Sequence, residues 1–215
     1  MWLEYYAEHF NTVELNASFY HIPKNNVTMG WAQRTPRDFK FSVKVTRLIT
    51  HVRKLQNCDD IIEWFFREME PLRKKVLVYL LQLPPSFTPN PDHLKIFLNR
   101  LPQINRYVIE FRNESAFTGS LPDILTEKNI GFCIHDYPGI ESPPVVTSDV
   151  VYVRFHGYGR QYAGSYPDDV LRDWSIKMKK WSDGGRTVLV YFNNDLEGSA
   201  ISNALTLREN LSLHR

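Results

Sequence analysis

The feature that most constrains this chain is an alternation of short β-rich segments with longer stretches of helical periodicity. The helical stretches include Asp59–Arg73, His93–Leu101 and Asp168–Trp181. Strands that alternate with helices predict βαβ units and a parallel sheet. The strand-like segments are Thr12–Asn16, Phe39–Thr46, Val76–Leu83, Tyr107–Arg112, Ile130–Asp136, Val150–His156 and Thr187–Asn193.

Seven such strands in 215 residues suit either a (β/α) TIM-type barrel or a large doubly wound sheet. No glycine-rich phosphate loop follows any strand, which removes the main support for a dinucleotide-binding fold. No repeat, low-complexity tract or linker interrupts the chain. The sequence therefore predicts an α/β, (β/α) TIM-type barrel built as a single domain over residues 1–215.

Composition narrows the functional classes. The net charge is +2, so no field of the whole protein predicts binding to nucleic acid or to a membrane. Cys58 and Cys133 lie far apart without a CxxC partner, which predicts buried thiols in a reducing compartment. No signal-peptide pattern and no apolar run of about 18 residues is present. We therefore expect a cytoplasmic protein without membrane contact.

Polar residues interrupt the strands with a regular offset. Alternate residues of a strand point to opposite faces. Phe39, Phe41, Val43 and Val45 form a wholly apolar set that we expect to face helices. The opposite set is polar and consists of Lys40, Ser42, Lys44 and Thr46. The same offset recurs on six strands. Barrels carry their sites at the carboxyl ends of the strands, so these polar sets predict one site there.

The predicted site contains residues from several strand ends. His135 or Asp136 joins from the fifth strand, whose facing the sequence does not decide. A closed network of structural salt bridges is the alternative, although burying ions costs several kcal/mol each. The remaining members of the predicted site are Glu14, Asn16, Lys44, Gln82, Glu110, Arg112, Arg154, His156, Tyr191 and Asn193.

Six ordered segments resemble a known family. They read FNTVELNASFYHIP, FKFSVKVTRLITH, LLQLPPSF, VIEFRNESAF, YVRFHG and VYFNND, and the resemblance covers residues 5 to about 208. These segments look like the signatures of YecE-like proteins, a family with a domain of unknown function and a TIM-barrel fold. The resemblance implies the barrel and places the matching polar residues at strand ends. It implies no reaction.

The start of the chain departs from that family. YecE-like relatives carry an earlier segment with a first strand before the helix that matches Trp2–Phe10. We therefore expect a barrel that lacks or truncates its first strand. Such a gap would expose edges on Thr12–Asn16 and Thr187–Asn193, and exposed edges favour pairing with another chain. A homodimer formed across this gap is a hypothesis.

The cations of the predicted site suit a small anionic ligand. Lys44, Arg112 and Arg154 fit a phosphate, a carboxylate or a sugar phosphate. As general acids or bases we select Glu14, Glu110 and His156. We add Tyr20 to the predicted site, because its ring can stack on a ligand. The leading hypothesis is an enzyme of hydrolase, isomerase or lyase type, with no cofactor assigned.

Two other functions stay open. Metal-assisted phosphodiester or sugar chemistry would use ligand types such as Glu14, His135 and Asp195, but no HxH or HExxH spacing supports it and no metal ligand is assigned. A non-catalytic binding module, for nucleic acid or another ligand, would use the basic run Lys44–Lys54. The role of His51 in that run stays open, and Trp64 and Trp174 are expected on buried helix faces.

Overall fold

The computed structural model describes residues 2–103, 105–137 and 139–213. The chain divides into two compact units, Met1–Phe111 (unit 1) and Arg112–Arg215 (unit 2). Within the described residues, no helix combines the length and the apolar character needed to cross a bilayer.

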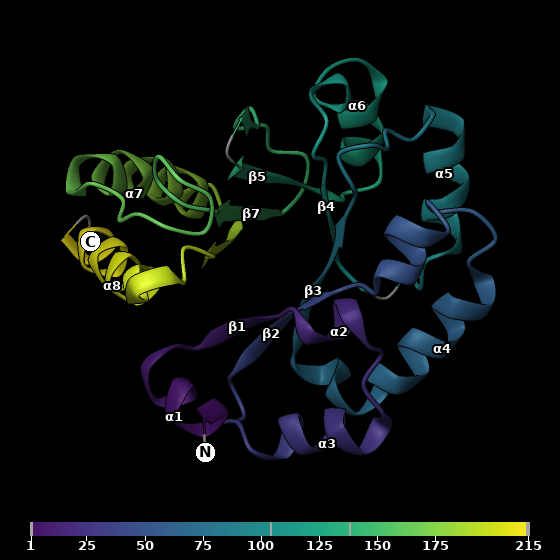
Figure 1. Cartoon of the computed structure of the whole chain (residues 1–215), viewed down its shortest axis with the longest axis horizontal. Helices are drawn as coiled ribbons and strands as arrows, with labels where there is room; N and C mark the ends of the chain where they lie inside the picture. The colour runs from purple at the N-terminus through teal and green to yellow at the C-terminus, as the bar shows by residue number, and fades with distance from the viewer. Residues whose placement is uncertain (1, 104, 138, 214–215) are drawn as a thin grey trace. The chain divides into compact units, whose positions relative to one another are not determined.

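Unit 1 builds a parallel sheet from strands taken in chain order. The order is β1-β2-β3-β4, and the colours of Figure 1 follow it from purple to teal. Its strands are β1 (Thr12–Leu15), β2 (Lys40–Lys44), β3 (Val76–Gln82) and β4 (Tyr107–Glu110). Its helices are α1 (Trp2–His9), α2 (Ala17–Tyr20), α3 (Asn25–Gln33), the π-helix η1 (Leu48–Val52), α4 (Asp59–Met69), the 3-10 helix η2 (Glu70–Lys75) and α5 (Pro91–Arg100).

Unit 2 repeats the pattern with three parallel strands. The order is β5-β7-β8, and a short β6 pairs antiparallel with β5. Its strands are β5 (Gly131–Tyr137), β6 (Ile140–Glu141), β7 (Val150–Phe155) and β8 (Thr187–Phe192). Its helices are η3 (Glu114–Ala116), α6 (Ser120–Glu127), α7 (Asp168–Asp183), η4 (Leu196–Gly198) and α8 (Ser199–Leu213).

The predicted α/β fold of the TIM-barrel type is confirmed. All seven predicted strands are present, with ends that differ by one or two residues. The connection from β5 to β7 carries the short strand β6. The prediction that the chain forms a single domain stays a prediction.

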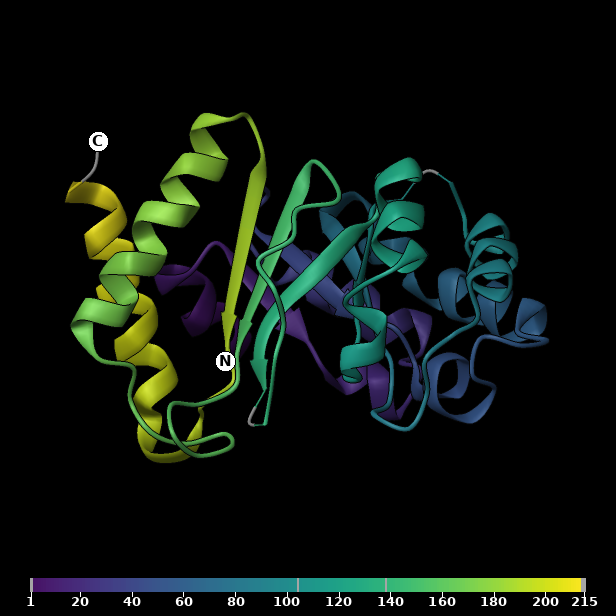
Figure 2. The ribbon, with the colours of Figure 1, turned by 90° about the horizontal axis from the view of Figure 1, so that it is seen from above.

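The apolar strand faces pack against helices, as the alternation predicts. In unit 2, Val151, Val153 and Phe155 of β7 share a buried cluster with Leu171 of α7 and Leu207 of α8. Figure 2 shows β5, β7 and β8 running in the same direction, with α7 and α8 beside them. Burial of such side chains contributes about 1.5–3 kcal/mol each. This packing holds the strands that carry the polar ends.

One helix-face expectation is wrong. α4 turns Ile61, Ile62, Phe65 and Met69 into the core, and acidic residues begin it where the helix dipole favours them. Trp64 lies beside this apolar stripe and is 42% exposed. Trp174, in contrast, packs partly buried against the unit 2 cluster, as expected.

Candidate functional site

The register of unit 1 aligns the polar side chains that the sequence singled out. Glu14 of β1 pairs with Ser42 of β2, and Gln82 of β3 pairs with Glu110 of β4. Partners in a parallel ladder project to the same face. Lys44 ends β2 on that face, because it follows Ser42 by two residues. Glu14, Ser42, Lys44, Gln82 and Glu110 therefore share one face of the unit 1 sheet. Their role in a site stays a prediction.

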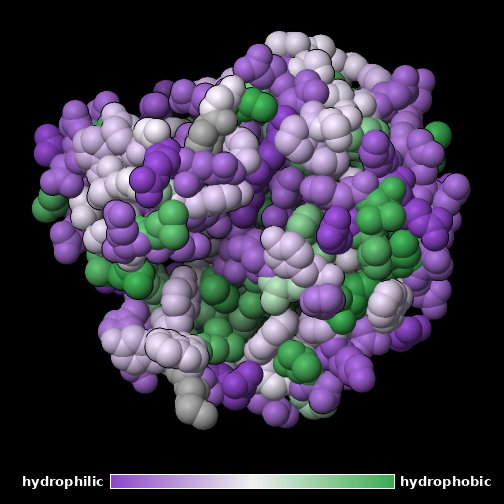
Figure 3. Space-filling model, in the orientation of Figure 1, coloured by the Kyte–Doolittle hydropathy of each residue, from purple (hydrophilic) through white to green (hydrophobic). Residues whose placement is uncertain are grey.

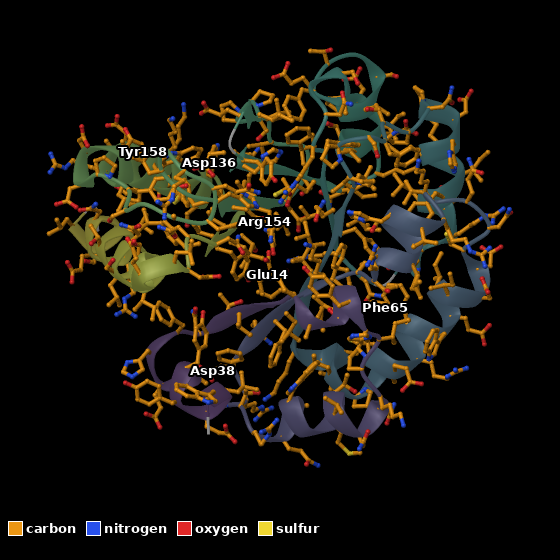
Figure 4. All side chains as sticks on the ribbon, in the orientation of Figure 1. Glu14, Asp38, Phe65, Asp136, Arg154 and Tyr158 are labelled. Carbon is orange, nitrogen blue, oxygen red and sulfur yellow. The ribbon has the colours of Figure 1, made fainter. Side chains whose placement is uncertain are left out.

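Local contacts orient several of these groups. The Asn16 amide donates to Glu14 Oε1 over 3.1 Å, and the Lys44 ammonium lies 4.1 Å from the centroid of the Phe19 ring. Such a cation over an aromatic face is stabilised by the quadrupole of the ring. The Gln82 amide instead donates to the carbonyl of Leu83 over 2.9 Å. Figure 4 labels Glu14 on β1.

The register of unit 2 decides the facing that the sequence left open. His135 of β5 pairs with Arg154 of β7, which pairs with Tyr191 of β8. All three side chains therefore project to the same face, and His135 joins it while Asp136 has the opposite facing. His135, Arg154 and Tyr191 are buried.

Two aromatic side chains contact the Arg112 guanidinium. Its guanidinium lies 3.9 Å from the centroid of the Tyr137 ring, and Nη2 lies 3.0 Å from Nε2 of His156. A guanidinium only donates, so Nε2 accepts and the imidazole carries its proton on Nδ1. That bond occupies the Nε2 lone pair. His156 can therefore act as a base at Nε2 only after Arg112 has moved away.

Asp136 fixes the loop that follows β7. Its Oδ1 accepts the backbone N–H of His156 over 2.6 Å, and its Oδ2 accepts a short hydrogen bond from the Tyr166 hydroxyl. Burial raises the pKa of the Asp136 carboxyl to about 6, against the lowering effect of these hydrogen bonds. Both oxygens have protein donors, so the predicted ligand contact of Asp136 stays a prediction. Figure 4 labels Asp136, Arg154 and Tyr158 on unit 2.

Asn193 contributes a donor that the protein does not use. It follows β8 with the same facing as Tyr191, and its backbone N–H donates to the Phe155 carbonyl over 2.7 Å. Its side-chain Nδ2 is buried and has no acceptor among residues 2–103, 105–137 and 139–213. A buried amide without a partner costs about 1–3 kcal/mol, and this cost disappears when a ligand accepts the hydrogen bond.

Tyr20 lies apart from the strand faces. It ends α2, is 64% exposed and lines a groove of unit 1 with Arg47 and Trp64. His51 lies in the π-helix η1, with its Nδ1 2.9 Å from the Thr50 hydroxyl. Its ring centroid is 5.0 Å from that of Phe19. The groove was missed from the sequence, where Trp64 reads as a core residue.

The metal alternative receives no support from side-chain grouping. Among the described residues, no three His, Cys, Asp or Glu side chains lie close enough together to hold a metal ion. The sequence reasoning also missed Tyr137 and Tyr166, which orient Arg112 and Asp136. Neither tyrosine belongs to a motif. Tyr137 ends β5, whereas Tyr166 lies in the long connection between β7 and α7, where the sequence gives no signal.

Comparison with known proteins identifies the family. A family model described as "Protein of unknown function DUF72" matches residues 1–215. The chain is 40% identical to the UPF0759 protein YecE of Escherichia coli K12, over 54% of this chain and 43% of that protein. The matched segment thus spans less than half of the E. coli protein. The UPF0759 protein YunF of Bacillus subtilis is 28% identical, over 98% of this chain and 86% of that protein.

A solved structure shows the same fold. The crystal structure of a DUF72 family protein from Thermotoga maritima superposes with a TM-score of 0.87 at 28% identity, covering 98% of this chain and 88% of that one. A DUF72 family protein from Enterococcus faecalis gives 0.86 at 26% identity. The resemblance to YecE-like proteins seen in six segments is therefore confirmed over the whole chain. The chain belongs to the DUF72 family, proteins of unknown function.

Proposed function

We propose that the strand ends of unit 2 bind a small anionic molecule, such as a phosphate, a carboxylate or a sugar phosphate. The observation that carries this proposal is the burial of two guanidiniums in one unit, with Arg112 7% exposed and Arg154 3% exposed. Removing an ion from water costs several kcal/mol, so two buried arginines are costly for stability alone. A guanidinium matches the two oxygens of a carboxylate or a phosphate.

The surroundings of these cations favour the same ligand class. The two contacts of Arg112 described above, to the Tyr137 ring and to Nε2 of His156, fix the direction of its guanidinium. The unused Asn193 amide adds a donor with the facing of Tyr191. Hydrogen-bond donors and cations together fit an anionic ligand with several oxygen acceptors. A metal ion would be repelled by the same arginines.

Catalysis on such a molecule is the finer part of the proposal. His156 is the proton-transfer group of unit 2, and an anion that attracts the Arg112 guanidinium would free Nε2 of His156. Glu14 and Glu110 are the corresponding candidates of unit 1. The reaction class proposed is hydrolase, isomerase or lyase chemistry without an assigned cofactor.

Titration of the full chain with inorganic phosphate tests the binding step. We expect a melting temperature that rises with phosphate, since a ligand at 100 times its Kd stabilises by about 2.7 kcal/mol. Arg112→Gln and Arg154→Gln should remove that rise. Arg172→Gln is the matched control, because Arg172 is exposed on α7. If the control and the two site variants respond alike, unit 2 holds no anion site.

A second variant separates a functional site from a structural charge network. Glu110 is fully buried, and Glu110→Gln keeps its shape while removing its charge. If the charges form a network that stabilises the fold, this substitution should lower the melting temperature of the protein. A site that holds charge for function should keep or gain stability. If the free energy of unfolding of Glu110→Gln falls by more than about 3 kcal/mol, the structural charge network is favoured.

A further inference from the structure

A groove on unit 1 lies where the carboxyl ends of two neighbouring strands continue into loops. It has a volume of about 480 Å³ and is lined by Tyr20, His21, Ile22, Thr46, Arg47, Leu48, Val52 and Trp64. The first three residues follow β1, and the next three follow β2. Sites of TIM-type barrels lie at these ends, and small-molecule sites occupy about 300–1,000 Å³. We infer that this groove binds a mononucleotide, with the base on its aromatic rings and the phosphate on Arg47.

The aromatic side chains of the groove are placed for stacking. Tyr20 is 64% exposed and Trp64 is 42% exposed, although both are large apolar rings. Trp64 makes no ring contact and its indole N–H no hydrogen bond within the part of the chain that is described. Exposed aromatic rings of this kind are the surfaces on which bases stack, and stacking accepts every base because each has a π-face.

Arg47 supplies the charge. It is exposed, and among the described residues its guanidinium has neither a hydrogen bond nor an ion pair. The groove lining contains no carboxylate that would neutralise it. The flanking sequence is also free of acidic residues from Phe39 to Cys58. A phosphate ester therefore meets a guanidinium that is not already engaged by the protein.

The backbone beside the groove is unusual in a way that is common at binding sites. Leu48–Val52 form a π-helix, a rare conformation that is frequent at functional sites. Lys54 and Leu55 follow with φ angles of 47° and 66°, in the left-handed region that lysine and leucine rarely adopt. This segment carries Arg47 and Val52 into the groove. Such strained segments cluster at ligand sites.

The composition of the lining favours a nucleotide over other ring-shaped ligands. The lining combines two exposed aromatic rings, Tyr20 and Trp64, with one exposed guanidinium, Arg47. A mononucleotide carries the two matching groups, an aromatic base and a phosphate, whereas a sugar phosphate has no aromatic ring to stack. Figure 3 shows apolar surface, in green, on the side of the view where α4 and α5 lie.

Tryptophan fluorescence of the full chain with adenosine monophosphate tests the inference. Saturable quenching is expected, and Trp64→Phe should remove most of it although four other tryptophans remain of the five. Trp64→Ala should weaken binding measured by equilibrium dialysis about tenfold or more. Arg47→Gln should weaken the binding of adenosine monophosphate about tenfold and leave the binding of adenosine unchanged, because the substitution removes only the contact with the phosphate.

Matched controls separate this groove from the anion site of unit 2. Trp2→Ala removes a tryptophan that is 90% exposed outside the groove, and Arg37→Gln removes an exposed arginine outside it. Both should bind like the parent chain. Arg112→Gln should keep the Trp64 quenching, even if phosphate binding by unit 2 is lost.

Three results would overturn the inference. One is the absence of saturable quenching at millimolar nucleotide. Another is an equal loss of affinity for adenosine and for adenosine monophosphate in Arg47→Gln. The third is binding of a single-stranded oligonucleotide or a peptide at Trp64 without any binding of the mononucleotide. A failure of phosphate titration in unit 2 affects the proposed function alone.

Discussion

The strand ends of the two units differ in how their polar groups are held. In unit 2, Asp136 and Tyr166 fix the loop after β7, and Tyr137 with His156 fixes Arg112. In unit 1, Arg47 and Trp64 border an open groove and have no such partners among the described residues. Hydrogen bonds therefore fix the side chains at the strand ends of unit 2, whereas the side chains around the groove of unit 1 stay free to adapt to a ligand. Substitutions in unit 2 should therefore cost more stability.

The sharpest test of the fixed loop is Gly157→Ala. Gly157 has φ +127°, and a Cβ there would lie 2.2 Å from the Arg160 carbonyl oxygen and 2.6 Å from that of Ala163. We expect a loss of about 3 kcal/mol or more in urea unfolding, from clash and backbone strain together. Gly159→Ala is the control, because φ is +71° there with nothing within 4 Å of the Cβ. It should cost about 1 kcal/mol. Equal losses would mean that the loop is not tightly packed.

The Asp136 carboxyl should make the fixed loop sensitive to pH. Burial raises its folded-state pKa from 3.8 to about 6, so the folded protein binds a proton more tightly than the unfolded chain. This contribution to stability is present below about pH 4 and is lost as the pH rises through 6. Relative to Asp136→Asn, the parent chain should gain up to about 3 kcal/mol between pH 7 and pH 4. Urea unfolding of both proteins at several pH values measures it, and parallel profiles would contradict it.

Tyr166→Phe removes the hydroxyl that links two parts of this loop. That hydroxyl donates to Asp136 and accepts the Gly157 N–H over 2.9 Å, so both partners lose a bond. We expect a loss of about 1–3 kcal/mol. Tyr158→Phe is a matched control because Tyr158 is half exposed and its ring contacts Tyr166. The control should change stability by less than about 0.5 kcal/mol.

The smallest effect is expected for Arg47→Gln in the open groove. Its guanidinium has no partner among the described residues, so the free energy of unfolding should change by less than about 0.5 kcal/mol. Arg112→Gln should cost about 1–3 kcal/mol, because the Tyr137 and His156 contacts are lost. Thermal and urea unfolding of both variants measure the two losses of stability. A larger loss for Arg47→Gln would reverse the contrast between the units.

The sequence by itself determined the fold class and the faces of the strands. Strand alternation is a local property with a period of two residues, so Glu14, Lys44, Gln82 and Glu110 are assigned to one face without coordinates. His135 and Asp136 escaped this rule because their strand, IGFCIHD, is apolar on both faces for most of its length.

Only the tertiary structure decided which groups touch. Asp136 meets Tyr166 across 30 residues, and Arg112 meets His156 across 44. These contacts depend on loop closure, which local periodicity does not encode. Trp64 shows the same limit, because a helical pattern gives the direction of a side chain but not what packs over it. The strand faces were thus readable from the sequence, whereas the exposed groove and the fixed loop arise from long-range packing.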